Sequence, residues 1–175
     1  MTFIFWGYFL IFFHLRINGF DLLPDFLGWA LIAAGLNGLA DKSEHFKQAK
    51  PWAAGLAVYT GIITAGQLFG MNFIGLVFIV INIIVFCVNL YISYSVACGV
   101  GDWERSTGQE LGAGKLMEVW KVMAVLNIAS SVLIRIPSEM ILILAVILSV
   151  AALVANVVFL MRIYKVKKAY DNPNL

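Results

Sequence analysis

Long runs of apolar residues, broken by short clusters of charged residues, glycine or proline, fill most of the chain. A helix of about 20 apolar residues, at 1.5 Å per residue, crosses the roughly 30 Å hydrocarbon core of a bilayer. Six runs come close to this length, and we expect an all-α polytopic transmembrane bundle that forms a single domain over residues 1–175. The predicted spans cover residues of about 1–17, 24–40, 51–70, 72–98, 114–136 and 139–163.

The first two runs are the shortest and contain the most polar residues. His14 and Arg16 stand near the end of the first run, and Pro24 and Asp25 open the second. A second arrangement therefore stays open, in which four helices span and residues 1–40 form a re-entrant hairpin. The first run has no basic segment before it and no small-x-small cleavage site after it, so we expect it to be retained.

The positions of the basic residues predict the orientation of the spans. Lysine and arginine are enriched in the short loops on the cytoplasmic side of a membrane. With six spans and a cytoplasmic N-terminus, ten of the twelve basic residues fall inside, and Arg16 and Arg135 fall outside. Both ends of the chain are then cytoplasmic. The ten are Lys42, Lys47, Lys50, Arg105, Lys115, Lys121, Arg162, Lys165, Lys167 and Lys168.

Composition agrees with a membrane protein. Hydrophobic residues make up 62% of the chain, charged residues 13%, and the mean hydropathy is +0.91, whereas soluble domains carry about 25% charged residues. A net charge of +2 without a basic arm gives no indication of nucleic-acid binding. The two hydrophilic stretches, 41–50 and 101–115, are too short to be soluble domains, and the second is predicted to be a loop. We expect a cell membrane location, in a bacterial inner or plasma membrane.

The segment 14–29, HLRINGFDLLPDFLGW, is the most polar part of the apolar regions. Capping of the second helix by its aspartates, with an ion pair to Arg16, is one explanation of these residues. The other is a polar mouth on the outer face that binds a small ligand or cation, since ionisable groups at membrane depth are costly. The candidate ligand-binding residues are His14, Arg16, Asp21, Asp25, Gln67, Asn72, Arg135 and Glu139.

Asparagines recur within the predicted spans. Hydrogen bonds between helices explain them simply, at about 0.6–2 kcal/mol each in a membrane. A polar lining for a solute path is the alternative. The asparagines assigned to helix packing are Asn37, Asn82, Asn89, Asn127 and Asn156.

Motifs of common enzyme chemistry are absent from the sequence. It contains no GxSxG, HExxH or P-loop pattern, and we expect no catalytic residues, no cofactor and no metal. Cys87 and Cys98 lie in one predicted helix, eleven residues or about 16 Å apart, which is too far for an intrachain disulfide. We therefore expect a protein that is not an enzyme.

The run RINGFDLLPDFLGWALI resembles a loop-and-helix signature of small, uncharacterised multi-span proteins of bacterial membranes. The resemblance covers about residues 14–40 and implies no particular activity. In size, span number and termini the chain is also similar to the substrate-binding subunits of energy-coupling factor vitamin transporters. Those subunits carry an Ala-x-x-x-Ala contact motif in their first helix, where this chain has the bulky FIFWGYFLIFF.

Three classes of function follow from these observations. The first is a small-ligand-binding or transport-associated subunit with a polar site near the outer face. The second is a non-catalytic accessory, regulatory or immunity protein that binds another membrane protein. The third is an enzyme that acts on lipid, with His14 as a base. Expected partners are membrane lipids, then another membrane protein or a second copy of the chain.

We expect Arg16 to form an ion pair with Asp21 or Asp25. Arg16→Gln should then lower the thermal stability in detergent, and adding Asp21→Asn or Asp25→Asn should restore part of it, because the unpaired carboxylate is removed. Thermal unfolding of the single and double variants measures the coupling. Simple additivity in both double variants would contradict the pair.

Overall fold

The computed structural model describes residues 1–12, 16–17, 20–21, 25–71, 75–136 and 139–171. The all-α fold class is confirmed: these residues form six helices, with one small hairpin after the first of them. The hairpin strands pair antiparallel, with Arg16 in register with Asp21. The elements are α1 (Thr2–Phe12), β1 (Arg16–Ile17), β2 (Phe20–Asp21), α2 (Asp25–Asn37), α3 (Glu44–Leu68), α4 (Leu76–Thr107), α5 (Ala113–Leu133) and α6 (Glu139–Asp171).

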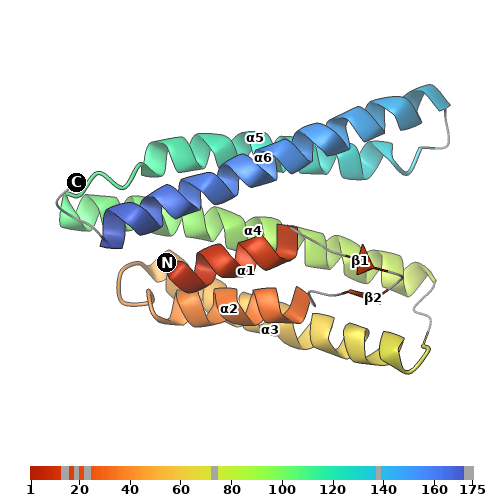
Figure 1. The fold of residues 1–175 in the computed structure, drawn as a ribbon, viewed down its shortest axis with the longest axis horizontal. Helices are drawn as coiled ribbons and strands as arrows, with labels where there is room; N and C mark the ends of the chain where they lie inside the picture. Colours follow the sequence, from red (N-terminus) through yellow and green to blue (C-terminus); the bar gives the residue numbers. More distant parts are fainter. Residues whose placement is uncertain (13–15, 18–19, 22–24, 72–74, 137–138, 172–175) are drawn as a thin grey trace.

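The six helices close into a ring. Each helix packs against the next one along the chain, and α6 also packs against α1. The start of α1 and the end of α6 lie at the same end of the bundle, together with the α2–α3 and α4–α5 connections (Figure 1). The segments 42–50, 105–121 and 162–168, which contain ten lysines and arginines, belong to this end. We call it the basic end.

Three of the described helices, rather than six, are long and apolar enough to cross a membrane by themselves: α4, α5 and residues Met140–Tyr170 of α6. The eleven residues of α1 and thirteen of α2 give lengths of only about 17 and 20 Å. The first helix stops at Phe12 because the chain turns into the β1–β2 hairpin, five residues before the predicted end at 17. The 25-residue α3 is long enough, but glycine, threonine and glutamine dilute its apolar residues.

Capping residues explain why α3 and α4 extend beyond the predicted spans. Ser43 has extended backbone angles, and its Oγ accepts a hydrogen bond from the His45 N–H at 3.1 Å, so α3 begins seven residues before the predicted start at Pro51. At the other end of the pair, α4 continues to Thr107 and ends at Gly108, whose φ is +68°. The predicted loop 101–115 is therefore helical at both of its ends.

Close packing is concentrated at the basic end. The largest fully buried side chains there come from all six helices and include Ile4, Leu36, Phe46, Val100 and Ile163. In contrast, none of residues 76–91, which form the first half of α4, is buried. The helices are thus held together tightly at one end of the ring and loosely at the other.

Glycines bring α1 and α2 to backbone contact. A Cβ added at Gly7 would lie 2.6 Å from the carbonyl oxygen of Gly28, and one added at Gly28 would lie 2.9 Å from that of Gly7. Helices in a membrane gain little from excluding water, so such close van der Waals approach is a main source of their association. The pair of helices α1 and α2 is therefore a tightly packed unit, although both helices are short.

Gly7→Ala should destabilise the protein by about 1–3 kcal/mol, because the new methyl group overlaps a backbone oxygen that cannot rotate away. Gly55→Ala is the matched control: its Cβ meets nothing within 4 Å, and alanine favours the helix by up to about 1 kcal/mol. Thermal unfolding in detergent should separate the two variants. Equal stabilities would contradict the close contact.

Candidate functional site

Three of the eight residues predicted to form an outer-face site have described side chains. Asp25 begins α2 and is half-buried, while Gln67 and Arg135 are exposed. The Arg135 guanidinium donates to the Ser131 carbonyl of its own chain turn at 3.2 Å, and no hydrogen bond or ion pair between Gln67 and Arg135 is found in the described part of the chain. A site that includes these three residues stays a prediction.

The other five members of that set are less completely described. His14 and Asn72 lie outside the described residues. At Arg16, Asp21 and Glu139 the structure describes the backbone, which places the first two opposite each other in the hairpin. Their joint role in ligand binding stays a prediction.

A cavity of about 280 Å³ lies between α5 and α6, beside the middle of α6 and the last two turns of α5. Half of its lining residues are polar, although the surrounding helix faces are apolar. The polar residues are Asn127 and Ser130 of α5 and Ser149 and Asn156 of α6, and the apolar ones are Ala152, Leu153 and Val157 of α6 and Phe12 of α1.

The two asparagines join the helices across this cavity. Asn127 Nδ2 donates to Asn156 Oδ1 at 3.2 Å and to the Met123 carbonyl at 2.8 Å. The serine hydroxyls donate within their own helices, Ser130 to the Asn127 carbonyl at 3.1 Å and Ser149 to the Ala145 carbonyl at 2.8 Å. The Asn127 amide and both serine hydroxyls thus donate to protein acceptors, while several oxygen atoms of the lining accept no hydrogen bond from the described residues.

The cavity therefore keeps hydrogen-bonding capacity for an occupant. Within the described residues, nothing accepts from Asn156 Nδ2 and nothing donates to Asn127 Oδ1. A hydroxyl that donates also keeps lone pairs to accept with, as the oxygens of Ser130 and Ser149 do. No side chain in the lining carries a charge. The arrangement can bind a neutral group that both donates and accepts hydrogen bonds.

A buried hydroxyl lies next to this lining. Tyr8 is fully buried, and its ring packs on Phe12 at 5.5 Å and edge-on to Phe159 at 5.7 Å, between ring centroids. Its hydroxyl has no hydrogen-bond partner among the described residues, which costs about 1–3 kcal/mol in an apolar setting. Phe12 lines the cavity, and Phe159 follows Asn156 by three positions, so the unsatisfied hydroxyl belongs to the same region.

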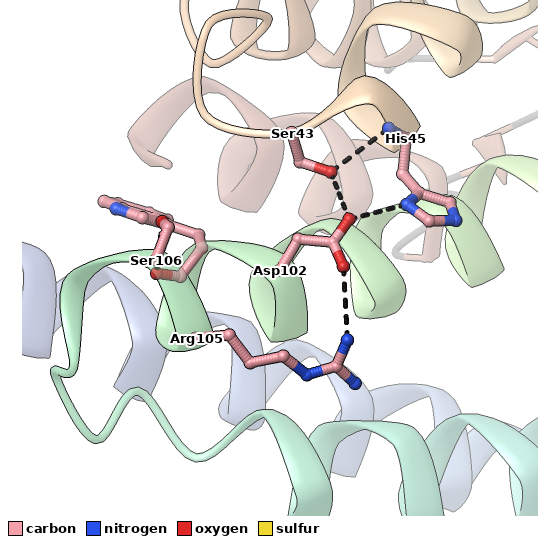
Figure 2. A network of polar contacts seen from close by, with 6 residues as sticks. Ser43, His45, Asp102, Arg105 and Ser106 are labelled. Carbon is pink, nitrogen blue, oxygen red and sulfur yellow. Dashed lines mark hydrogen bonds and ion pairs between the residues drawn. The ribbon is translucent and has the colours of Figure 1, made fainter.

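A second polar cluster joins α3 to α4 at the basic end (Figure 2). Asp102 Oδ2 accepts from Ser43 Oγ at 2.7 Å and contacts His45 Nδ1 at 2.7 Å. Its Oδ1 lies 3.6 Å from the guanidinium of Arg105. Asp102 lies in α4 beyond residue 98, the predicted end of the fourth span, and the cluster belongs to the basic end.

The composition of this cluster matches a Ser-His-Asp triad, but its order does not. In a triad the imidazole lies between the hydroxyl and the carboxylate, so that it can take the proton of the nucleophile. Here Asp102 lies between Ser43 and His45, and the Ser43 hydroxyl caps α3. The arrangement lacks the order of a triad, and its hydrogen bonds join the start of α3 to α4 as a clamp.

Hydrogen bonds to the carboxylate determine its protonation. Those from Ser43 and then His45 hold the pKa of Asp102 below its ordinary value, with smaller contributions from the charges of His45 and Arg105, against a partial desolvation. Asp102 is consequently ionised at neutral pH, which keeps the clamp intact.

Other polar residues connect neighbouring helices or stay within one. Lys50 Nζ donates to Asn37 Oδ1 at 2.6 Å, which links α3 to α2, and Trp120 Nε1 donates to Ser93 Oγ at 3.0 Å, which links α5 to α4. Asn82 Nδ2 donates to the Phe78 carbonyl of its own helix at 2.8 Å. Asn89 is half-buried in α4.

Cysteine and metal chemistry add no further site in the described part of the chain. Cys87 and Cys98 are free thiols. No group of three or more histidine, cysteine, aspartate or glutamate residues suited to a metal ion occurs among the described residues.

Comparison with protein-family models, with curated proteins and with solved structures finds no match. The assignment of a function thus depends on the geometry of the chain itself. Sequence reasoning named Asn127 and Asn156 but did not pair them, and it missed the cluster of Ser43, His45 and Asp102. Serine before a charged helix start was a signal for the cap; nothing local indicated its partner 59 positions away.

Asp102→Asn should lower thermal stability in detergent at pH 7 by about 1 kcal/mol, because hydrogen bonds to a charged acceptor are replaced by weaker ones. A carboxylate whose pKa is lowered by folding stabilises the fold above its unfolded pKa of about 3.9, and this stabilisation is lost as pH falls through the lower folded pKa. The difference from wild type should therefore shrink below about pH 4. Asp41→Asn, an exposed change of equal charge, is the control and should have little effect. A difference that persists unchanged at pH 3 would contradict the clamp.

Proposed function

We propose that the protein is a multi-pass protein of a bacterial cell membrane that binds a small neutral ligand in the cavity between α5 and α6. The observation that carries the proposal is the group of four polar side chains around a 280 Å³ space between two apolar helices, α5 and α6. Its class is that of a ligand-binding or transport-associated subunit without catalytic chemistry.

The lengths of the helices support four spans and a hairpin inserted from the cytoplasmic side. α4, α5 and α6 are long and apolar enough to cross, and α3, about 37 Å long by its 25 residues, runs beside α4. α1 and α2 are too short to cross and both return to the basic end (Figure 1). An even number of spans places both termini on one side, and the collected basic residues favour the cytoplasm.

Membrane energetics support a ligand rather than simple helix packing. One asparagine on each helix suffices for the inter-helix hydrogen bond that stabilises a pair of helices. The two serines and the uncommitted amide atoms exceed that need, and a cavity lined by them attracts a polar occupant. Its volume is just under the range of about 300–1,000 Å³ for small-molecule sites, which favours a ligand smaller than a typical drug molecule.

The absence of charge in the lining limits the chemistry of the ligand. A carboxylate or ammonium ion in the middle of the membrane would need an opposite charge beside it. Amide and hydroxyl groups instead suit a neutral molecule with alcohol, amide or urea-like groups. Phe12 of α1 offers one apolar wall for its carbon skeleton.

Protein purified in mild detergent should carry such a molecule, which denaturation should release for mass spectrometry. Asn156→Val should lose it at least tenfold, because the variant removes both the free amide donor and the Oδ1 that accepts from Asn127. Asn82→Val is the matched control, since Asn82 bonds its own helix on an exposed face, and it should retain the molecule. Thermal unfolding of both variants checks that the fold survives.

Water alone in the cavity would give a different result. No small molecule would then be released from the wild type, and Asn156→Val would change stability only. That outcome would overturn the proposed ligand-binding function. Co-purification of another membrane protein in place of a small molecule would favour the accessory class instead.

A further inference from the structure

A second concavity lies on the opposite side of α6 from the ligand cavity. It is a groove of about 500 Å³ between α5 and α6, lined almost entirely by carbon. Its residues on α6 alternate with those of the cavity at helical spacing, so the two sites face in different directions. The groove is lined by Glu118, Val119, Val122 and Leu126 of α5 and by Ala151, Val154, Ala155 and Val158 of α6.

The face of each helix that forms the groove continues into basic residues toward the basic end. On α6, Arg162 and Lys165 follow Val158 by four and seven positions, which places them on the same side of the helix. On α5, Lys115 precedes Val119 by four positions and is again on that side. Three cations from two helices thus stand where the apolar groove ends.

These three cations lack protein partners in the described part of the chain. Lys115 and Lys165 are exposed, and Arg162 is half-buried. None of them forms an ion pair within 4 Å with a described residue, although Glu118 lines the adjacent end of the groove. With that carboxylate included, the group carries a net charge of +2 and can accept an anion.

We propose that the α5–α6 groove binds an anionic phospholipid of the cytoplasmic leaflet. One acyl chain lies in the groove along the valine and alanine side chains, and the phosphate headgroup is held by Lys115, Arg162 and Lys165. Basic residues between helices at the cytoplasmic surface are suited to such headgroups, and arginine binds phosphate with two parallel hydrogen bonds.

The charges favour a lipid over a transmembrane helix as the occupant. A helix in the groove would need acidic residues at its end to balance the three cations. An anionic lipid, in contrast, has its phosphate in the headgroup layer, at the surface of the hydrocarbon core. Glu118 lies about 8 Å from the start of α5 at 1.5 Å per residue, which is close to the boundary between headgroups and chains. The acyl chain of the lipid therefore faces the apolar part of the groove, and its headgroup faces the basic residues.

Native mass spectrometry in mild detergent tests the lipid site. Phosphatidylglycerol and phosphatidylcholine with identical chains should be added in turn, and the first should be retained at least tenfold more. Arg162→Gln with Lys165→Gln should weaken phosphatidylglycerol binding by about tenfold, since each basic residue near the surface contributes to attraction. Lys42→Gln with Lys47→Gln, which removes the same charge from the α2–α3 side, is the control and should change it little.

A variant that fills the groove separates the chain from the headgroup. Ala151→Phe adds bulk to the groove lining and leaves the three cations in place, so it should reduce retention of the lipid while glycerol phosphate, which has no chain, stays unbound in every variant. Equal retention of the two lipids, or equal loss in the control double variant, would overturn the proposal. So would a dimer that Ala151→Phe dissociates, since a helix of a second copy would then occupy the groove.

Binding at the lipid site and binding in the ligand cavity can be tested independently. Arg162→Gln with Lys165→Gln should leave the small molecule of the cavity in place, and Asn156→Val should leave phosphatidylglycerol binding unchanged, because the two sets of residues lie on opposite faces of α6. Loss of both ligands in either variant would indicate damage to the α5–α6 pair and would contradict separate sites.

Discussion

Close contact between helix backbones at one end of the ring is the constraint on which the rest of the structure depends. Without water to exclude, two helices in hydrocarbon gain mainly from van der Waals contact and from shared hydrogen bonds. Gly7 and Gly28 bring α1 against α2, and Gly99 lets the ring of Phe46 lie directly on α4. The clamp on Asp102 adds polar bonds to the same α3–α4 contact. With these helices fixed, α6 can close on α1, and the α5–α6 pair is placed with its polar cavity toward Phe12.

The α4–α5 turn shows how one side chain can fix the geometry of two long helices. The Glu104 carboxylate accepts hydrogen bonds from the N–H groups of Leu111 at 2.8 Å and Ala113 at 3.0 Å. It thereby satisfies the amide of Ala113, which begins α5, and that of Leu111 in the turn before it, and its negative charge lies at the positive end of the helix dipole. Gly108 and Gly112 supply the left-handed backbone at the two ends of the turn.

The sequence was sufficient for the number and order of the helices, because apolar runs and their polar breaks are local signals. It overestimated how many of them can cross a membrane. The apolar run of residues 1–17 was taken as one helix, but Arg16 and Ile17 belong to the β1–β2 hairpin. Start positions were also missed where a cap overrides composition, as Ser43 does before a charged first turn. Pairing between distant positions, such as Asn127 with Asn156 or Ser43 with Asp102, depends on helix rotation and register, which no local pattern records. The outer-face set could be named by residue type, and its joint role stays a prediction.

Buried side chains from all six helices meet at the basic end, whereas residues 76–91 of α4 have none. The first half of α4 is therefore held less tightly by its neighbours than its second half. Twenty residues of helix span about 30 Å at 1.5 Å per residue. A tilt of α4 by about 5° at its packed end therefore moves a point about 30 Å away by about 2.6 Å. Small rearrangements at the basic end are thereby magnified at the other end of α4.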